Sequence, residues 1–272
     1  MNNTHTPTIE LYSALLDLYR YLNKSLFNDE LPEVIFTNQR HAKVTGHFAY
    51  KRWINNDNQI CHEISINPSY VSKANLIDLM QTLVHEMCHC WQYEYGKRQK
   101  QPGYHNFQWA EKMIALGLKP TDDGTKDGNI IGFKMYDYPI ADGKFLQVCQ
   151  ELLKQQQFEM PWLDIQVRRS QIDQLIDDEK INPVDVITSE IIAESIQDED
   201  VKAQLCMPLA AIIGDENFEE LQKKSSKRTK YTCIGCKANV WGKKDLNLNC
   251  GNCQLQLIAD FKEPTENIAG SE

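Results

Sequence analysis

The stretch "TLVHEMCHCWQYEYGK", residues 82–97, places His85 and His89 four positions apart, with Glu86 directly after the first histidine. Residues four apart on a helix project from one face, so both imidazoles can reach one Zn2+ ion at about 2.0–2.1 Å. Glu86 lies too far around the helix to be the natural third ligand. It is placed to take a proton from a metal-activated water and to deliver it to a leaving amine. The pattern is typical of zinc peptidases.

The residues before this stretch predict that it lies on a buried helix. Asn75 is a suitable N-cap and Asp78 falls in the first turn. The following apolar side chains form a wide face that includes Leu83, Val84 and Met87. Burying two histidines and a glutamate without compensation is costly, and a bound metal ion removes that cost. The context therefore favours a metal site over a chance match.

A catalytic zinc takes three protein ligands and keeps one open position. In the metzincin pattern a glycine and a histidine would follow at positions 92 and 95, where this chain has Gln92 and Tyr95. That class is excluded. Glu111 would be the third ligand in a gluzincin arrangement. His105 is the stronger candidate, because it begins the next predicted helix directly after a glycine-containing loop and can be aimed at the first helix.

The remaining histidines and the scattered cysteines are expected to pack or to lie at the surface. Neither Cys88 nor Cys90 can share the metal face, because successive helical positions point about 100° apart. Isolated cysteines in a reducing compartment are usually small buried hydrophobes. The residues in this group are His5, His41, His47, His62, Cys61, Cys88, Cys90, Cys149 and Cys206.

The first half of the chain predicts a helix followed by a small sheet. Leucines at three- and four-residue intervals indicate an amphipathic helix over about residues 8–27. "EVIFT", "TGHFAYKRW" and "HEISINP" are short, β-branched or aromatic segments, which predict an antiparallel meander. After the metal helix, "YHNFQWAEKMIALGL" predicts a second helix ended by Gly117 and Pro120. For residues 121–148 we expect loops and one further strand.

The net charge of −9 argues against a nucleic-acid partner, but the charge is unevenly distributed. Residues 151–222 hold 17 Asp and Glu against 5 Lys and Arg, whereas residues 222–244 hold 8 Lys and Arg and no carboxylate. The acidic segment contains helical patterns such as "SQIDQLIDDEKI" and "DVITSEIIAESIQ" and no recognisable chemistry. We expect a helical connector there, and an anionic partner for the basic end of the chain.

Four of the nine cysteines follow the spacing C-x2-C-x13-C-x2-C within "YTCIGCKANVWGKKDLNLNCGNC". Four thiolates at this spacing close a tetrahedral zinc site with no open position, so this zinc is structural and allows about 30 residues to fold around little core. The ligands are Cys233, Cys236, Cys250 and Cys253.

Cations and aromatic rings around this ribbon predict contact with nucleic acid. Phosphate neutralisation combined with base stacking, at roughly 1–3 kcal/mol per base, is the usual way to hold single strands. The alternative is a ribbon that only stabilises the chain or docks a protein, and either ring could instead lie in its core. The expected nucleic-acid contacts are Lys223, Lys224, Lys227, Arg228, Lys230, Tyr231, Lys237, Trp241, Lys243 and Lys244.

These motifs together make the chain resemble the SprT-like family, which includes proteases of DNA–protein crosslinks. The matching pieces are "EISINPSY", "LVHEMCHCWQYEYG", "GYHNFQWAEKMIALGL" and the cysteine ribbon. The resemblance implies an α+β zinc metalloprotease domain that cleaves proteins on or crosslinked to DNA. It further implies His85, His89 and His105 as zinc ligands and Glu86 as general base. The acidic connector matches nothing in the family's pattern.

The sequence thus predicts an α+β fold: a helix, a small antiparallel sheet, zincin-type active-site helices, an acidic helical connector and a zinc ribbon. We expect a monomer with one catalytic and one structural Zn2+, acting on DNA-bound proteins with single-stranded DNA as a partner. No membrane segment or secretory leader is expected, which suggests a cytoplasmic protein, nucleoid-associated in a bacterium.

The rival hypotheses are a non-enzymatic zinc-containing nucleic-acid-binding or transcription-associated protein, and a peptidase with no nucleic-acid requirement. The expected parts are 1–148 (protease), 149–229 (connector), 230–262 (ribbon) and 263–272 (disordered tail).

Overall fold

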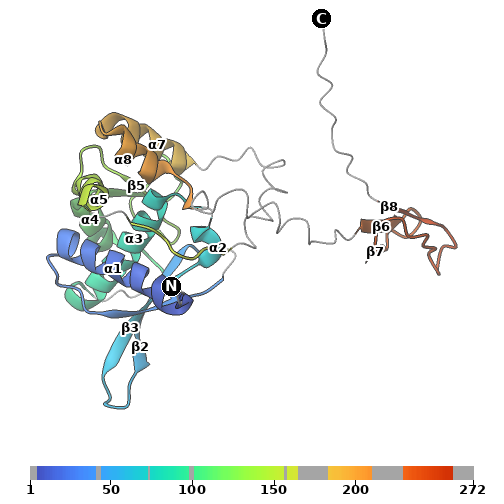
Figure 1. Ribbon diagram of the computed structural model, residues 1–272, viewed down its shortest axis with the longest axis horizontal. Helices are drawn as coiled ribbons and strands as arrows, with labels where there is room; N and C mark the ends of the chain where they lie inside the picture. Colours follow the sequence, from blue (N-terminus) through green and yellow to red (C-terminus); the bar gives the residue numbers. More distant parts are fainter. Residues whose placement is uncertain are drawn as a thin grey trace, which may run out of the picture. The chain divides into compact units, whose positions relative to one another are not determined.

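The structure is a computed structural model that describes residues 5–40, 44–72, 74–97, 101–155, 158–164, 183–209 and 229–259 (Figure 1). The chain divides into two compact units, Met1–Ile213 and Gly214–Glu272. His41, the first part of the predicted connector helices and the predicted disordered tail lie outside the described residues.

The first unit begins with the predicted amphipathic helix and a three-stranded sheet. The elements are α1 (Pro7–Phe27), β1 (Val34–Asn38), β2 (Gly46–Ile54) and β3 (Ile60–Ile66). Helix α1 buries its leucine face, and Tyr19 on that face packs edge-on against Phe36 of β1 at 5.9 Å between ring centroids. The apolar periodicity therefore predicted both the helix and the side that it buries.

The sheet differs from the expected antiparallel meander. Its strand order is β1-β3-β2, with β1 parallel to β3 and β2 antiparallel to β3. Strand β3 is buried at every residue from His62 to Ile66, whereas β2 is exposed from Tyr50 to Ile54. A central strand is covered on both faces, so the more buried strand takes the centre and β2 becomes an edge. The expectation of an all-antiparallel sheet is wrong, and the sheet is mixed.

The metal-motif helix is α3 (Leu76–Tyr95), preceded by the short α2 (Pro68–Val71). Its N-cap is Asn75, as predicted, and the backbone N–H of Asn75 donates to Asp78 Oδ2 at 2.9 Å. The helix is buried over most of its length, and its apolar residues join the main core with those of α1 and the sheet. The core thus fixes the orientation of the motif before any metal binds.

The second predicted helix is α4 (Phe107–Leu116), and it ends at Gly117, which takes the left-handed conformation with φ +95°. It is followed by an antiparallel pair, β4 (Leu118–Thr121) and β5 (Tyr136–Pro139), and by α5 (Lys144–Gln155). Within residues 121–148 the structure therefore has the one further strand that was predicted, β5, and also the start of α5, which was not predicted; β4 reaches this region only at Thr121. The boundary expected at residue 148 falls inside α5.

Two helices of the predicted connector belong to the first unit. Helix α7 (Pro183–Ser195) packs against β5, and α8 (Glu199–Cys206) packs against α3 and α5. Behind α8, the backbone N–H of Leu209 donates to Ala74 O at 3.0 Å, just before α3 begins. The acidic residues of the two helices face outwards while their apolar residues enter the main core. This part of the acidic segment is therefore an outer layer of the first unit, and it packs against α3, α5 and β5.

The second unit contains a three-stranded antiparallel sheet of order β7-β6-β8. The strands are β6 (Thr229–Cys233), β7 (Asn239–Gly242) and β8 (Leu257–Ala259). Its core is small and centres on Tyr231, Cys233 and Leu257. Within the described residues of both units, no helix is both long and apolar enough to cross a lipid bilayer.

We predict that removing apolar volume from α8 destabilises the first unit. Leu205 is fully buried, so Leu205→Ala should lower the free energy of unfolding by about 2–5 kcal/mol. The control Val186→Ala, at a side chain 43% exposed on α7, should change it by less than about 0.5 kcal/mol. Denaturant unfolding followed by circular dichroism measures both variants. An unchanged transition in Leu205→Ala would show that α8 folds apart from the unit.

Candidate metal centre

Helix α3 presents His85 and His89 on one face, one turn apart. Their ring centroids lie 5.1 Å from each other. The residue between the turns, Cys88, is fully buried on another side of the helix, as is Cys90. The packing role predicted for both cysteines is therefore confirmed, and the histidine face is left for the site.

His105 approaches this face from the loop before α4. It precedes the N-cap Asn106, so it lies just outside the helix that it was expected to begin. The backbone N–H of His105 donates to Gly132 O at 2.7 Å, and its ring Nδ1 lies 3.1 Å from the same oxygen. This anchoring directs the opposite ring nitrogen, Nε2, towards α3. His105 Nε2 lies 3.1 Å from the Nε2 atoms of both His85 and His89.

The three Nε2 atoms form a set of ligand atoms that suits a metal cation. Gly132 O is only an acceptor, so His105 Nδ1 carries the proton in the neutral ring and Nε2 offers a lone pair. His85 also carries its proton on Nδ1, which lies 3.0 Å from the accepting Asp137 Oδ2, so its Nε2 likewise offers a lone pair. Two lone pairs at this separation repel each other unless a cation lies between them. Two nitrogens bound tetrahedrally to zinc would be about 3.3–3.4 Å apart, so the geometry fits the metal.

Two further residues hold the histidines, and neither was predicted from the sequence. Asp137 on β5 orients His85, and Gln81 of α3 donates from Nε2 to Asp137 O at 2.9 Å. Trp109 on α4 is fully buried, and its ring centroid lies 4.4–5.4 Å from those of all three histidines. Asp137 lies 52 positions after His85, and no local spacing connects the two residues. Only the fold brings them together.

Glu86 is buried beside the histidines, against the first residues of β2. Burial is the main cause that raises the pKa of Glu86 to about 7, and a hydrogen bond from the backbone N–H of Phe48 partly opposes this shift. Gly46 permits the close approach of strand and helix, because a Cβ atom there would lie 2.8 Å from Thr82 Cγ2 and 3.0 Å from Glu86 Oε1. A buried carboxyl group with a raised pKa is suited to exchanging protons near neutral pH.

The pKa values of the three histidines shift in different directions. Burial lowers the pKa of His89 well below its usual range, and burial lowers the pKa of His105 to about 4. Burial also acts to lower the pKa of His85, but the hydrogen bond with Asp137 and the nearby Glu86 outweigh it and raise the pKa. Neutral rings are the form that binds a metal ion, so the environment of His89 and His105 favours ligation.

The alternative residues considered from the sequence lie elsewhere. Glu111 is exposed on α4 and is not part of the three-histidine group. Gln92 donates from Nε2 to Asn106 Oδ1 at 2.7 Å and so links α3 to the loop that carries His105. Tyr95 donates from its hydroxyl to Glu30 O. His5 and His47 are exposed and His62 is buried next to Glu94, as expected for surface and packing residues.

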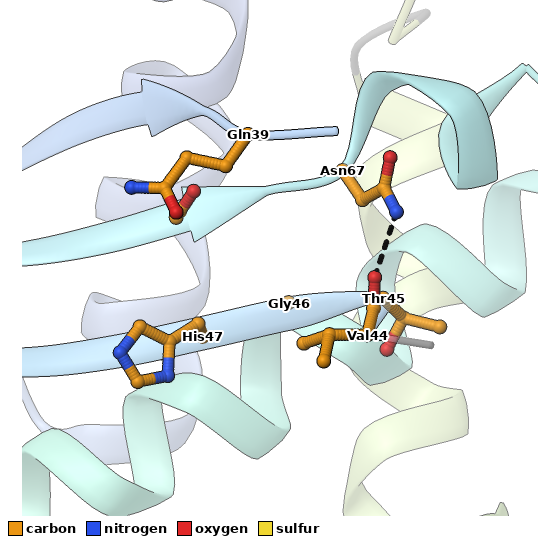
Figure 2. Close-up of a pocket in the computed structure, with 7 residues that line it drawn as sticks. Gln39, Val44, Thr45, Gly46, His47 and Asn67 are labelled. Atoms are coloured by element: carbon orange, nitrogen blue, oxygen red, sulfur yellow. Dashed lines mark hydrogen bonds between the residues drawn. The ribbon is translucent and has the colours of Figure 1, made fainter. Parts of the chain in front are cut away.

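A hollow of about 270 Å³ lies close to this centre, at the start of β2 (Figure 2). It is lined by Gly46, His47 and Gln39 among others, and Asn67 donates to Val44 O at 2.8 Å on its rim. None of the three clustered histidines lines it. The hollow is therefore separate from the metal centre, although Gly46 borders both.

The second unit contains the four-cysteine group. The four Sγ atoms of Cys233, Cys236, Cys250 and Cys253 all lie within 4.8 Å of one another, and Cys236 and Cys250 are 3.6 Å apart. This separation is far longer than a disulfide bond and close to the ~3.8 Å expected for two thiolates on one tetrahedral zinc. Backbone N–H groups of Cys236 and Gly235 lower the pKa of Cys233 to about 7, which favours the thiolate. The group is consistent with a closed zinc site.

The described part of the predicted nucleic-acid surface is divided between core and surface. Tyr231 is buried, donates its hydroxyl proton to Lys243 O at 2.6 Å and accepts from the N–H of Leu246. The expectation of an exposed stacking ring is therefore wrong for Tyr231, because a small unit needs this ring as its core. Trp241 is 59% exposed and lies opposite Lys230 across the β6–β7 pair. Lys237, Lys243 and Lys244 are exposed, and Lys223, Lys224, Lys227 and Arg228 lie outside the described residues.

Fold and site together define an α+β protein with a three-histidine group on a buried helix and a separate four-cysteine group, both suited to a metal ion. The sequence model of the SprT-like family matches residues 15–123 of the chain. The matched segment contains α1 from Leu15 onwards, the sheet, α3 and α4, and therefore all three histidines and Glu86. The resemblance predicted from the motifs is confirmed over this segment, and the cysteine ribbon lies outside it.

One curated protein is similar over a short stretch. It is described as an "Uncharacterized protein in mucB 3'region" of Salmonella typhimurium, and it is 38% identical over 48 residues, which are 18% of this chain and 65% of that protein. The chain thus spans just under two thirds of the length of this relative. No solved structure matches the chain.

We predict that Asp137→Asn weakens metal binding at the three-histidine group by about 10–100-fold, because the amide cannot supply the negative charge that fixes and polarises His85. Asp127→Asn, at an exposed carboxylate of the preceding loop, should leave the affinity unchanged. Competition for Zn2+ with a chromophoric chelator measures the affinity of both variants. Equal Zn2+ affinities in the two variants would show that Asp137 does not contribute to metal binding.

Proposed function

We propose that this protein is a zinc-dependent endopeptidase of the zincin type that cleaves DNA-bound or DNA-crosslinked proteins. The observation that carries the proposal is the convergence of three Nε2 atoms beside the buried Glu86. The match to the SprT-like family model supports a metalloprotease. The peptidase activity is inferred from this chemistry, and DNA-bound or DNA-crosslinked substrates are what the resemblance to the family implies.

Each residue has a role that follows from its position. His85, His89 and His105 would hold the catalytic zinc, and Asp137 and Trp109 would keep their rings in place. When bound, the zinc supplies Lewis-acid activation of a water molecule and of a peptide carbonyl. Glu86 takes a proton from the attacking water and transfers it to the leaving amine, and its pKa near neutrality suits both steps.

The ribbon supports nucleic acid as the partner that brings substrates to this site. Trp241 exposes its ring next to Lys230, and Lys237, Lys243 and Lys244 add positive charge to the same small unit. Proteins that bind single-stranded DNA usually combine an aromatic ring that stacks on a base with cations that neutralise the phosphates. We propose a second zinc at the four cysteines, whose role is to fold this unit. A monomeric cytoplasmic protein, associated with the nucleoid in a bacterium, remains the accompanying expectation.

We predict that Glu86→Gln retains zinc and loses protease activity by at least about 10²-fold, because the amide cannot accept the proton of the attacking water. The control Glu111→Gln changes an exposed carboxylate outside the histidine group and should keep full activity. The assay compares cleavage of a DNA-bound protein with and without added single-stranded DNA, alongside zinc content. Cleavage by Glu86→Gln at the wild-type rate would favour the non-enzymatic rival.

We predict that Trp241→Ala lowers affinity for single-stranded DNA by about 5–100-fold, the equivalent of one lost stacking contact. Val240→Ala changes an exposed neighbour on the same strand and serves as the matched control. Fluorescence anisotropy with a labelled oligonucleotide measures both. Unchanged affinity together with unchanged DNA stimulation would leave the ribbon a purely stabilising role.

A further inference from the structure

The edge strand β2 carries an outward bulge near the metal centre. Ala49 pairs with Glu63 and Trp53 pairs with Cys61, so four steps along β2 match two steps along β3. Tyr50, Lys51 and Arg52 lie opposite His62 alone and leave the regular ladder, and Lys51 takes the left-handed conformation with φ +49°. A lysine in this conformation is uncommon, and bulges of this kind re-aim side chains beside active sites.

The bulge is held in place by buried hydrogen bonds. The backbone N–H of Lys51 donates to His62 Nδ1 at 2.8 Å. His62 is buried, and its other ring nitrogen lies 2.9 Å from Glu94 Oε1 on α3. The strained backbone is therefore tied to the metal-motif helix through one histidine. Its shape is a fixed feature of the unit.

Tyr50 of this bulge and Tyr93 of α3 form a platform. The rings of Tyr50 and Tyr93 stack with centroids 4.7 Å apart and planes inclined by 13°. Tyr50 remains 59% exposed, so one face of the stack is open to solvent. Lys51 Nζ lies 5.8 Å from the centre of the Tyr93 ring. Arg52 is exposed, and among the described residues neither Lys51 nor Arg52 forms an ion pair.

The platform lies next to the candidate active site. Tyr93 follows His89 by four residues on α3, so it projects from the same face one turn further on. Phe48, whose N–H reaches Glu86, packs against His62 and Tyr93 at 5.4 and 6.5 Å between ring centroids. A chain bound on the platform would therefore pass beside the metal centre. In Figure 1 the β2–β3 hairpin projects from the body of the unit, where a long ligand can reach it.

We propose that this platform, Tyr50, Lys51, Arg52 and Tyr93, is a second binding site for single-stranded nucleic acid, on the catalytic unit itself. It would stack one base on the open face of Tyr50 and neutralise neighbouring phosphates with Lys51 and Arg52. The inference rests on the proposed function only in that nucleic acid is present at the active site. A binding site for the DNA strand beside the metal centre would hold a protein crosslinked to that strand close to the metal, where it could be cleaved.

The shape and charge of the platform favour nucleic acid over a polypeptide. A peptide side chain is usually held in a concave pocket, whereas this surface is a projecting bulge with a flat open ring. The nearby carboxylates are already engaged, since Glu94 contacts His62, and Glu63 accepts from Trp53 Nε1 at 2.7 Å. Asp57, in the hairpin turn, is the exposed carboxylate of this hairpin. The two cations therefore remain available for an anionic ligand.

The test measures binding of a single-stranded oligothymidylate to the full chain, with two platform variants. Tyr50→Leu retains an apolar contact with Tyr93 and removes the stacking ring, and Lys51→Gln/Arg52→Gln removes both charges. Each should raise Kd by about 5–20-fold, and the double variant should reduce the salt slope by about 1.4. Lys24→Gln/Lys154→Gln, at exposed lysines of α1 and α5, is the charge-matched control and should bind as wild type does. Zinc content and thermal midpoint check the fold of each variant.

A second measurement locates the strand directly. Photocrosslinking of an oligonucleotide that contains 5-iodouracil should label a peptide containing Tyr50 or Tyr93. Unchanged affinity in both platform variants, or crosslinks confined to residues 229–259, overturns the proposal, as does a wild-type chain that binds no oligonucleotide. If the variants instead slow cleavage of a DNA-free unfolded protein and bind the oligonucleotide normally, the platform binds polypeptide. Because neither binding readout requires cleavage, loss of the protease hypothesis in the Glu86→Gln assay would leave this result unaffected.

Discussion

The placement of His105 Nε2 at 3.1 Å from the Nε2 atoms of both His85 and His89 is the constraint on which the rest of the first unit depends. Such a cluster is unfavourable without a cation, and it would spread apart if the surrounding structure allowed it. The structure prevents this by fixing each ring from behind. Gly132 O holds His105, Asp137 holds His85, and Trp109 packs against all three. The core is therefore built so that the binding geometry exists before a metal arrives.

This arrangement explains why elements far apart in the chain pack around α3. Strand β5 contributes Asp137, and α7 packs on β5 while α8 packs on α3. The helices that the sequence suggested as a separate acidic connector thus support the strand that orients a metal ligand. Their carboxylates face solvent because their apolar sides are needed inside. The negative charge of this segment follows from its position as an outer layer.

The ribbon has a small apolar core, and converging metal-binding side chains compensate for it. Its core consists of Tyr231, Cys233 and Leu257, which is too little apolar surface to offset the entropy of ordering some 30 residues. Four converging thiols provide the missing stabilisation once they hold a metal. With the core supplied by metal and one tyrosine, Trp241 is left free at the surface. The exposed and buried rings of the ribbon therefore have opposite roles, although they lie in neighbouring strands.

The sequence by itself determined every feature that depends on local spacing. The four-residue interval of His85 and His89, the cap at Asn75, the stop at Gly117 and the paired cysteines each follow from helix or turn geometry, and the structure has them where the spacing puts them. His105 was also predicted, because it directly follows a glycine-containing loop at the start of the next predicted helix. Tertiary structure alone decided the strand order β1-β3-β2, the burial of Tyr231, the pairing of Asp137 with His85 and the bulge at Lys51. These features depend on which surfaces are left to cover once the core has formed, and no local pattern records that competition.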